Sequence, residues 1–178
     1  MKRRGARRRV ARLRAQAAGA VLLIAAAMVW EGSVLAALFP IGEVPKIDFA
    51  RLIRRTSPNE YLACPRLLCQ AAADLESPIL AVPVERLQAA WQAALAEEPR
   101  VTLLREDPEL RQLDYVQRTP VMKFPDLVTA RFYDERNGQS TFAVYSRSVY
   151  GYGDGGANRQ RVTRWLALMR AELARGSP

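Results

Sequence analysis

The stretch LVTARFYDERNGQSTFAVYSRSV, residues 127–149, contains two runs of strand-forming residues separated by a turn. Asn137-Gly138 lies between the runs, and this pair favours the tight turns of β-hairpins because both central residues there need positive φ. Val, Thr, Phe and Tyr on either side are typical strand residues. We therefore predict antiparallel strands at residues 127–133 and 140–149.

Two further strands and two helices are predicted around this hairpin. Residues 101–105 and 113–118 are β-rich runs, and apolar residues recur at helical spacing in residues 84–97 and 158–174. Trp91 belongs to the apolar stripe of the first helix, and we expect it in the core and not at a ligand. The predicted fold class is α+β: an N-terminal transmembrane helix followed by a small domain with a four-stranded antiparallel sheet packed by two helices.

Positive charge is concentrated at the start of the chain. The net charge is +9, but eight of the 27 Lys and Arg residues lie in the first fourteen positions, and the other nineteen nearly balance the 18 acidic residues. A basic tail on a nearly neutral domain is typical of an address or an anchor. It argues against a nucleic-acid partner, which would need a basic face on the domain itself.

An uncharged apolar segment follows the tail. Residues 15–30 contain no charged side chain, and Trp30 with Glu31 would mark the outer boundary of a membrane span. Basic residues that precede a span stay in the cytoplasm. We therefore predict four parts: a basic cytoplasmic tail (1–14), a transmembrane anchor (15–39), a linker (40–55) and an extracytoplasmic α+β domain (56–178).

The predicted location is the bacterial inner membrane, with a single pass, a cytoplasmic N-terminus and a periplasmic C-terminal domain. A cleaved signal peptide is the alternative, since such peptides also combine a basic start, an apolar middle and small residues. Both interpretations place the domain outside the cytoplasm.

The chain has two cysteines, Cys64 and Cys69. In an oxidising compartment a pair at this spacing can close a short disulfide, and we favour this over two free thiols. The chain has no histidine and no second cysteine pair, so we predict no metal site and no cofactor.

A Gly-rich junction connects the last predicted strand to the last predicted helix. Its glycines permit positive φ, and free backbone N–H groups at a helix N-terminus attract anions. We predict a site for an anionic ligand formed by Ser146, Arg147, Ser148, Gly151, Asp154, Gly156, Asn158, Arg159 and Arg161. The alternative is that Asp154 and Asn158 only cap the helix and the glycines only form the turn.

The same junction carries a resemblance. Residues 146–162 match the pattern SRSxxGxxDxGxNRxRV and look like the closing signature of the DUF1499 family, and Ser57-Pro58-Asn59 resembles the opening motif of that family. Together the two motifs bracket residues 56–172. Because the family is named for having no established function, the resemblance implies no activity.

Two functions remain open. The first is a membrane-anchored, extracytoplasmic, non-catalytic binding or assembly module that takes an anionic small molecule, a lipid headgroup or a membrane-protein partner at the junction. The second is a hydrolase or transferase with Ser146 or Ser148 as nucleophile and Asp154 as base. Without histidine the Ser-His-Asp arrangement is excluded, and we expect no catalytic residue.

Overall fold

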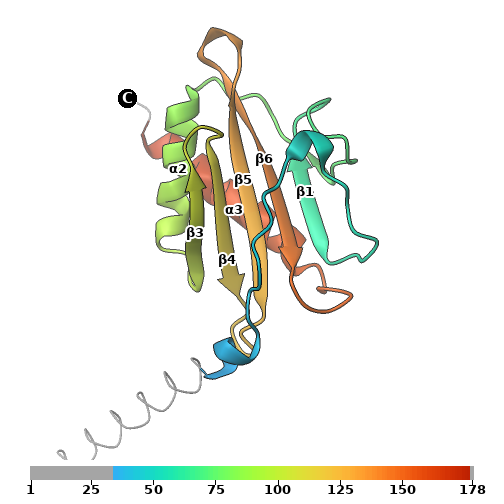
Figure 1. Cartoon of the computed structure of the whole chain (residues 1–178). Coiled ribbons are helices and arrows are strands. Elements are labelled where there is room, and N and C mark those ends of the chain that lie inside the picture. Colours follow the sequence, from blue (N-terminus) through green and yellow to red (C-terminus); the bar gives the residue numbers. More distant parts are fainter. Residues whose placement is uncertain (1–33, 177–178) are drawn as a thin grey trace, which may run out of the picture. The chain divides into compact units, whose positions relative to one another are not determined.

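The computed structural model describes residues 34–176 (Figure 1). The chain divides into two compact units, residues 1–40 and residues 41–178. Within residues 34–176 there is no helix long and apolar enough to cross a membrane. The structure thus gives no support to the transmembrane helix in the predicted fold class. The predicted tail and the predicted anchor as far as residue 33 lie outside the described residues.

A six-stranded mixed sheet forms the centre of the second unit, in the order β2-β1-β6-β5-β4-β3. Strands β3 to β6 pair antiparallel, as predicted, and β1 is antiparallel to β6 but parallel to β2. The predicted four-stranded, all-antiparallel sheet is therefore wrong. The strands are β1 (Glu60–Cys64), β2 (Leu75–Glu76), β3 (Val101–Asp107), β4 (Gln112–Arg118), β5 (Pro125–Asp134) and β6 (Ser140–Ser148).

The two unpredicted strands lack the alternation that marks a half-buried strand. β1 has the sequence EYLAC, and four of its five residues are buried because both faces of the sheet are covered at this place. A short strand buried on both faces shows no period of two. β2 has only two residues and forms the edge of the sheet. Neither strand could be found from a polar and apolar pattern.

The predicted hairpin is confirmed. β5 and β6 pair antiparallel up to Asp134 and Ser140. Asn137 and Gly138 have φ values of 61° and 68°, the left-handed region that this turn requires. The backbone N–H of Glu135 donates to the carbonyl oxygen of Gln139 at 2.8 Å and closes the loop.

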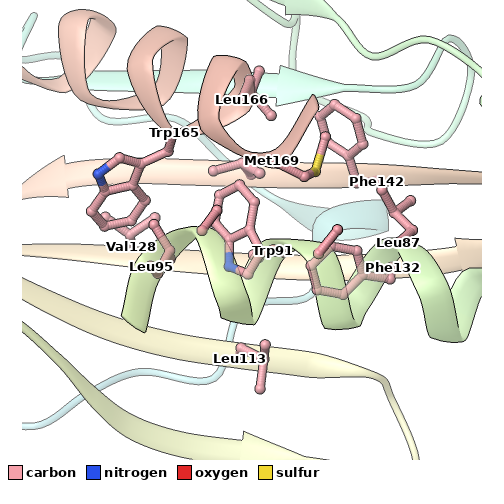
Figure 2. Packing of buried hydrophobic residues seen from close by; sticks show 14 of the residues in the cluster. Leu87, Trp91, Leu95, Leu113, Val128, Phe132, Phe142, Trp165, Leu166 and Met169 are labelled. Atoms are coloured by element: carbon pink, nitrogen blue, oxygen red, sulfur yellow. The ribbon is translucent and has the colours of Figure 1, made fainter. Parts of the chain in front are cut away.

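Two helices cover one face of the sheet, α2 (Val84–Ala96) and α3 (Ala157–Arg175). Trp91 of α2 lies at the centre of this layer and is fully buried (Figure 2). Its ring makes edge-to-face contacts with Phe132 at 6.0 Å and with Trp165 at 5.9 Å. Such aromatic pairs stabilise a core beyond the area that they bury. The prediction that Trp91 is a core residue is confirmed.

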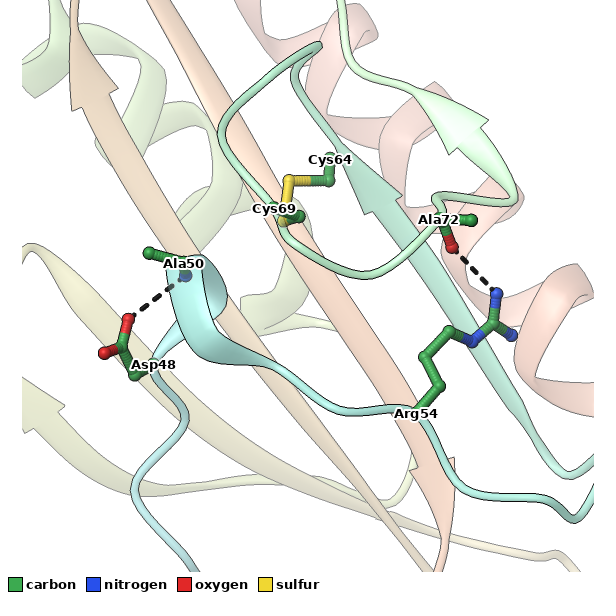
Figure 3. The surroundings of a disulfide bond; sticks show 6 residues. All are labelled: Asp48, Ala50, Arg54, Cys64, Cys69 and Ala72. Carbon is green, nitrogen blue, oxygen red and sulfur yellow. Dashed lines mark hydrogen bonds between the residues drawn. A yellow bond between two sulfur atoms is a disulfide. The ribbon is translucent and has the colours of Figure 1, made fainter.

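Residues 41–55, here called the strap, cover part of the opposite face. The strap contains the short 3-10 helix η1 (Phe49–Arg51), in which Asp48 accepts a hydrogen bond from the N–H of Ala50 at 3.1 Å (Figure 3). Phe49 is fully buried in a second apolar cluster with Leu62 and Tyr145. Part of the segment predicted as a linker is thus packed on the sheet.

The disulfide prediction is confirmed: Cys64 at the end of β1 is bonded to Cys69, with 6.3 Å between their Cα atoms (Figure 3). The bond closes the loop between β1 and β2. Cys64 is buried in the second cluster and Cys69 packs against that cluster. The cross-link therefore joins the loop to the part of the sheet that the strap covers.

We predict that Phe49→Ala lowers the free energy of unfolding by about 3 kcal/mol, because it removes a fully buried ring and leaves a cavity under the strap. Urea unfolding monitored by tryptophan fluorescence measures the change. Ile53→Ala is the matched control, since Ile53 lies in the same strap and is 83% exposed. Equal stability of the two variants would show that the strap is not part of the fold.

Reduction of the disulfide should lower the free energy of unfolding by about 2 kcal/mol, the loop entropy expected for so short a closed loop. Urea unfolding of the same chain with and without dithiothreitol measures it. Alkylation in the absence of reductant should label neither Cys64 nor Cys69. Labelling of both thiols under that condition would contradict the cross-link.

Candidate functional site

Strand β6 divides the predicted ligand site between the two faces of the sheet. Successive side chains of a strand point to opposite faces. Ser146 and Ser148 therefore face α3, and both hydrogen bond to a residue of that helix. Arg147 faces the strap side, where it stacks on Tyr145. The structure does not bring Arg147 together with the other predicted residues.

The Gly-rich loop turns around Asp154. One carboxylate oxygen accepts from the N–H of Gly156 at 2.9 Å, and the other accepts from the N–H of Asn158 at 2.8 Å and from its amide nitrogen at 2.7 Å. Gly156, with φ 81°, takes the left-handed conformation just before α3. The start of the helix therefore already holds an internal anion, and the capping alternative is supported.

Asn158, the second residue of α3, is fully buried, and both the oxygen and the nitrogen of its side-chain amide form hydrogen bonds. Its carbonyl oxygen accepts from Ser146 Oγ and from Arg161 Nη1, each at 2.6 Å. Its nitrogen also donates to the backbone oxygen of Asn59 at 2.9 Å and to Ser148 Oγ at 3.1 Å. One amide thus fastens α3 to β6 and to the residue that precedes β1.

Arg161 completes this buried network one turn further along α3. Its Nε donates to Gln117 Oε1 at 2.6 Å, its Nη1 donates to Ser146 Oγ at 2.9 Å, and its Nη2 forms an ion pair with Asp126. These partners come from β4, β6 and β5. Because both charges are buried, their pairing is needed to offset the loss of hydration. Arg161 is thus a structural residue and is not free to bind a ligand.

The serines offer no support for a catalytic role. Ser146 Oγ is fully buried and donates to an amide oxygen of Asn158, which cannot accept a proton as a base does. Ser148 Oγ accepts from the same side chain. Within the described residues, the carboxylate of Asp154 accepts hydrogen bonds from N–H groups of the junction and from no serine hydroxyl. Nucleophilic catalysis needs a base in contact with the nucleophile.

Arg159 is the charged residue of the predicted set that faces solvent. It follows Asn158 on α3, is exposed, and forms no hydrogen bond or ion pair within residues 34–176. It borders a pocket of about 410 Å³ at the open edge of β1, beyond the two residues that pair with β2. The other residues that line the pocket are Pro58, Glu60, Tyr61, Asp74, Asp154 and Gly156.

Arg54 of the strap holds the acidic wall of this pocket in place. Its Nε donates to Glu60 Oε1 at 2.7 Å, and its Nη2 pairs with Asp74 at 2.9 Å. Figure 3 shows its third bond, from Nη1 to the carbonyl oxygen of Ala72 at 3.1 Å. Asp74 also accepts from the N–H of Leu62. Burial alone would lower the pKa of Arg54, but the two carboxylates more than offset this and raise it.

The pocket is polar and carries charges of both signs. Glu60, Asp74 and Asp154 supply three carboxylates, and Arg54 and Arg159 supply two guanidinium groups at or beside the pocket. No group of three acidic or cysteine side chains in the described part of the chain is arranged to hold a metal ion. An anionic group would be attracted to Arg159, whereas the partly exposed carboxylate of Asp74 would accept a hydrogen bond from a donor.

Sequence reasoning missed the charged residues of the acidic wall: Glu60 and Asp74, which line the pocket, and Arg54, which pairs with both. Glu60 follows the opening motif directly, and this position was the one available signal. Arg54 lies in the segment predicted as a linker. Asp74 lies beyond the disulfide loop, and only the fold of that loop brings it to Leu62.

A family model described as "Protein of unknown function (DUF1499)" matches residues 56–169. No curated protein matches the chain. The matched range includes both ends of the buried network, from Asn59 to Arg161.

Three solved structures show a distant likeness. A protein from Mesorhizobium loti is 14% identical, with 58% of this chain and 100% of that chain covered and a TM-score of 0.41. A protein from Chromobacterium violaceum is 12% identical, with 68% and 99% covered and a TM-score of 0.41. An uncharacterised protein from Rhizobium leguminosarum is 19% identical, with 56% and 94% covered and a TM-score of 0.37. At these scores the likenesses support no conclusion about function.

We predict that Asp154→Asn makes the free energy of unfolding less dependent on pH between about pH 5 and pH 2. Burial alone would raise the pKa of Asp154, but hydrogen bonds from the N–H groups of Asn158 and Gly156 and from the Asn158 side chain lower it. A lowered pKa contributes stability above the unfolded value of about 4, and this contribution is lost as pH falls through the folded value. The variant should show a smaller loss of stability over this range.

Urea unfolding from about pH 5 down to about pH 2 checks this. At neutral pH, Asp154→Ala should cost about 1 kcal/mol, as for other lost helix caps. The control is Asp134→Asn, because Asp134 is an exposed acid at the hairpin end of β5. Wild type, Asp154→Asn and Asp134→Asn with one common pH profile would rule out the cap.

Proposed function

The chain belongs to the DUF1499 family, whose function is not established, and we propose from its site that it is a non-catalytic binding module for a small polar ligand with one anionic group. The ligand would lie in the pocket at the open edge of β1, with its anionic group on Arg159. One observation carries the proposal: Arg159 is exposed at a pocket, whereas the side chains of Asn158 and Arg161 form hydrogen bonds and an ion pair inside the domain.

The chemistry of the walls narrows the ligand class. A guanidinium group binds carboxylate and phosphate through charge-assisted hydrogen bonds. The carboxylates of Glu60, Asp74 and Asp154 repel further negative charge. Glu60 and Asp154 already accept internal hydrogen bonds, so the partly exposed Asp74 is the acceptor for a donor group of the ligand. A ligand that fits both features has a single phosphate or carboxylate next to hydroxyl or ammonium donors. Phosphoglycerol and phosphoethanolamine groups have this character, either as free molecules or as lipid headgroups.

We also propose that the domain works outside the cytoplasm, in an oxidising compartment. The disulfide between Cys64 and Cys69 supports this, because such bonds form and persist in those compartments. The bond also closes the loop that leads to Asp74, one wall of the pocket.

Arg159→Ala should weaken binding of glycerol 3-phosphate to the full chain at least tenfold, the effect of losing one charge-assisted hydrogen bond. Isothermal titration calorimetry measures it. Arg170→Ala is the matched control, since Arg170 is another exposed arginine of α3 that lies three turns from the pocket. Glycerol without phosphate should bind neither protein measurably.

Vesicles that contain phosphatidylglycerol separate the two ligand sources. Binding to vesicles but not to glycerol 3-phosphate, with the same dependence on Arg159, would identify a headgroup. Equal affinity of wild type and Arg159→Ala for every probe would refute the proposal that this pocket binds the ligand.

A further inference from the structure

Arg147 is a buried cation on the strap side of the sheet. Its side chain is 2% exposed and lies over the ring of Tyr145, 5.1 Å from the ring centre. Nη1 makes one hydrogen bond, to Thr129 Oγ1 at 3.3 Å. Nη2 is buried and has no hydrogen-bond partner among residues 34–176. A guanidinium with five donors is thus held largely away from water, and Thr129 is its one hydrogen-bond partner within the described residues.

Carboxylates lie near Arg147, but other groups occupy them. Asp114 accepts from Thr129 at 2.6 Å and pairs with Arg105, whose Nε and Nη2 lie at 2.8 and 2.5 Å. Glu60 pairs with Arg54 through one oxygen. Its other oxygen accepts from the hydroxyl group of Tyr145 and from the N–H of Arg55. Neither acid makes a direct bond to Arg147.

The guanidinium group of Arg55 adds to the excess of positive charge near Arg147. Arg55 ends the strap, is exposed, and donates from Nη1 to the carbonyl oxygen of Ser148 at 2.9 Å. The guanidinium group of Arg55 pairs with no carboxylate in the part of the chain that the structure describes. Burial lowers the pKa of Arg147 and the charge of Arg55 lowers it further, while Tyr145, Asp114 and Glu60 oppose this.

A buried charge without a partner is costly, and proteins normally offset it with a counter-charge. Arginine does not solve the problem by losing its proton, because its intrinsic pKa is too high. We propose that Arg147 and Arg55 together bind a small monovalent anion, a halide ion or a carboxylate of about the size of acetate, between the strap and the sheet. Arg55 forms the outer wall, and the buried Nη2 of Arg147 forms the inner contact.

The site uses other cations than the pocket at Arg159, although Glu60 borders both. It lies on the strap side of the sheet, whereas Arg159 belongs to α3 at the open edge of β1. A bound anion would also connect the strap to β6 through charge, in addition to the apolar contact of Phe49. Anion binding and strap stability should therefore be linked.

The first test is diffraction from crystals of the full chain soaked in sodium bromide. The expected result is anomalous density within hydrogen-bond distance of Arg147 Nη2. A water molecule or a protein oxygen in that position, with no anomalous density at Arg55 and no stabilisation by acetate in the second test, would overturn the proposal.

The second test is thermal unfolding of the full chain at constant ionic strength, with gluconate replaced stepwise by bromide or by acetate. The unfolding midpoint should rise with the logarithm of the concentration of the bound anion, because a ligand that binds only the folded state stabilises it. Arg147→Gln should lose this dependence. Because Arg55 is exposed, Arg55→Gln is expected to fold even where Arg147→Gln does not, and should bind the anion at least tenfold more weakly.

The control Arg159→Gln should retain the full response, which separates this site from the proposed ligand pocket. A response to acetate alone would define a carboxylate site, and a response to bromide would define a general monoanion site. Equal slopes for wild type, Arg55→Gln and Arg147→Gln would show a bulk salt effect and would refute the site.

Discussion

The buried ion pair between Arg161 and Asp126 is the contact on which the described domain depends most. It takes two charges out of water, which is costly unless the remaining donors and acceptors are also satisfied. Gln117 and Ser146 satisfy the other nitrogens of the guanidinium, so one side chain of α3 binds three adjacent strands. Asn158 adds the link to β1. The start of α3 is therefore fixed over the sheet with little freedom.

This fixed helix start determines what the Gly-rich junction can do. Asp154 occupies the amide groups that would otherwise attract an anion. Arg159 projects beside this cap, next to a pocket whose other wall is ordered by Arg54 from the strap. Residues that are far apart in sequence thus meet at the free edge of β1. Most residues of the motif therefore stabilise the fold, and the exposed Arg159 is the residue that remains available to bind a ligand.

The sequence predicted the helices and strands that have a clear turn motif or apolar spacing, and it missed the strands that have neither. The hairpin at Asn137-Gly138 and both helices follow from local turn chemistry and apolar spacing. β1 was missed because both its faces are buried. The strap falls within the segment predicted as a linker, and a few buried residues such as Phe49 are enough to dock it. The motif could be found in the sequence, but the separation of its residues between the two faces of the sheet could not. Successive residues of β6 point to opposite faces, so Arg147 lies on the other side from Ser146 and Ser148. Which polar groups of the motif form internal hydrogen bonds depends on the packing of the folded domain.

The most direct test of this account is a double-mutant cycle on the ion pair. The free energy of unfolding would be measured in urea for wild type, Arg161→Met, Asp126→Asn and the double variant. Each single change leaves a buried polar group unpaired and should cost about 3 kcal/mol or more, and the double variant should cost clearly less than the sum. Additive costs within about 0.5 kcal/mol would contradict the view that this pair fixes α3 on the sheet.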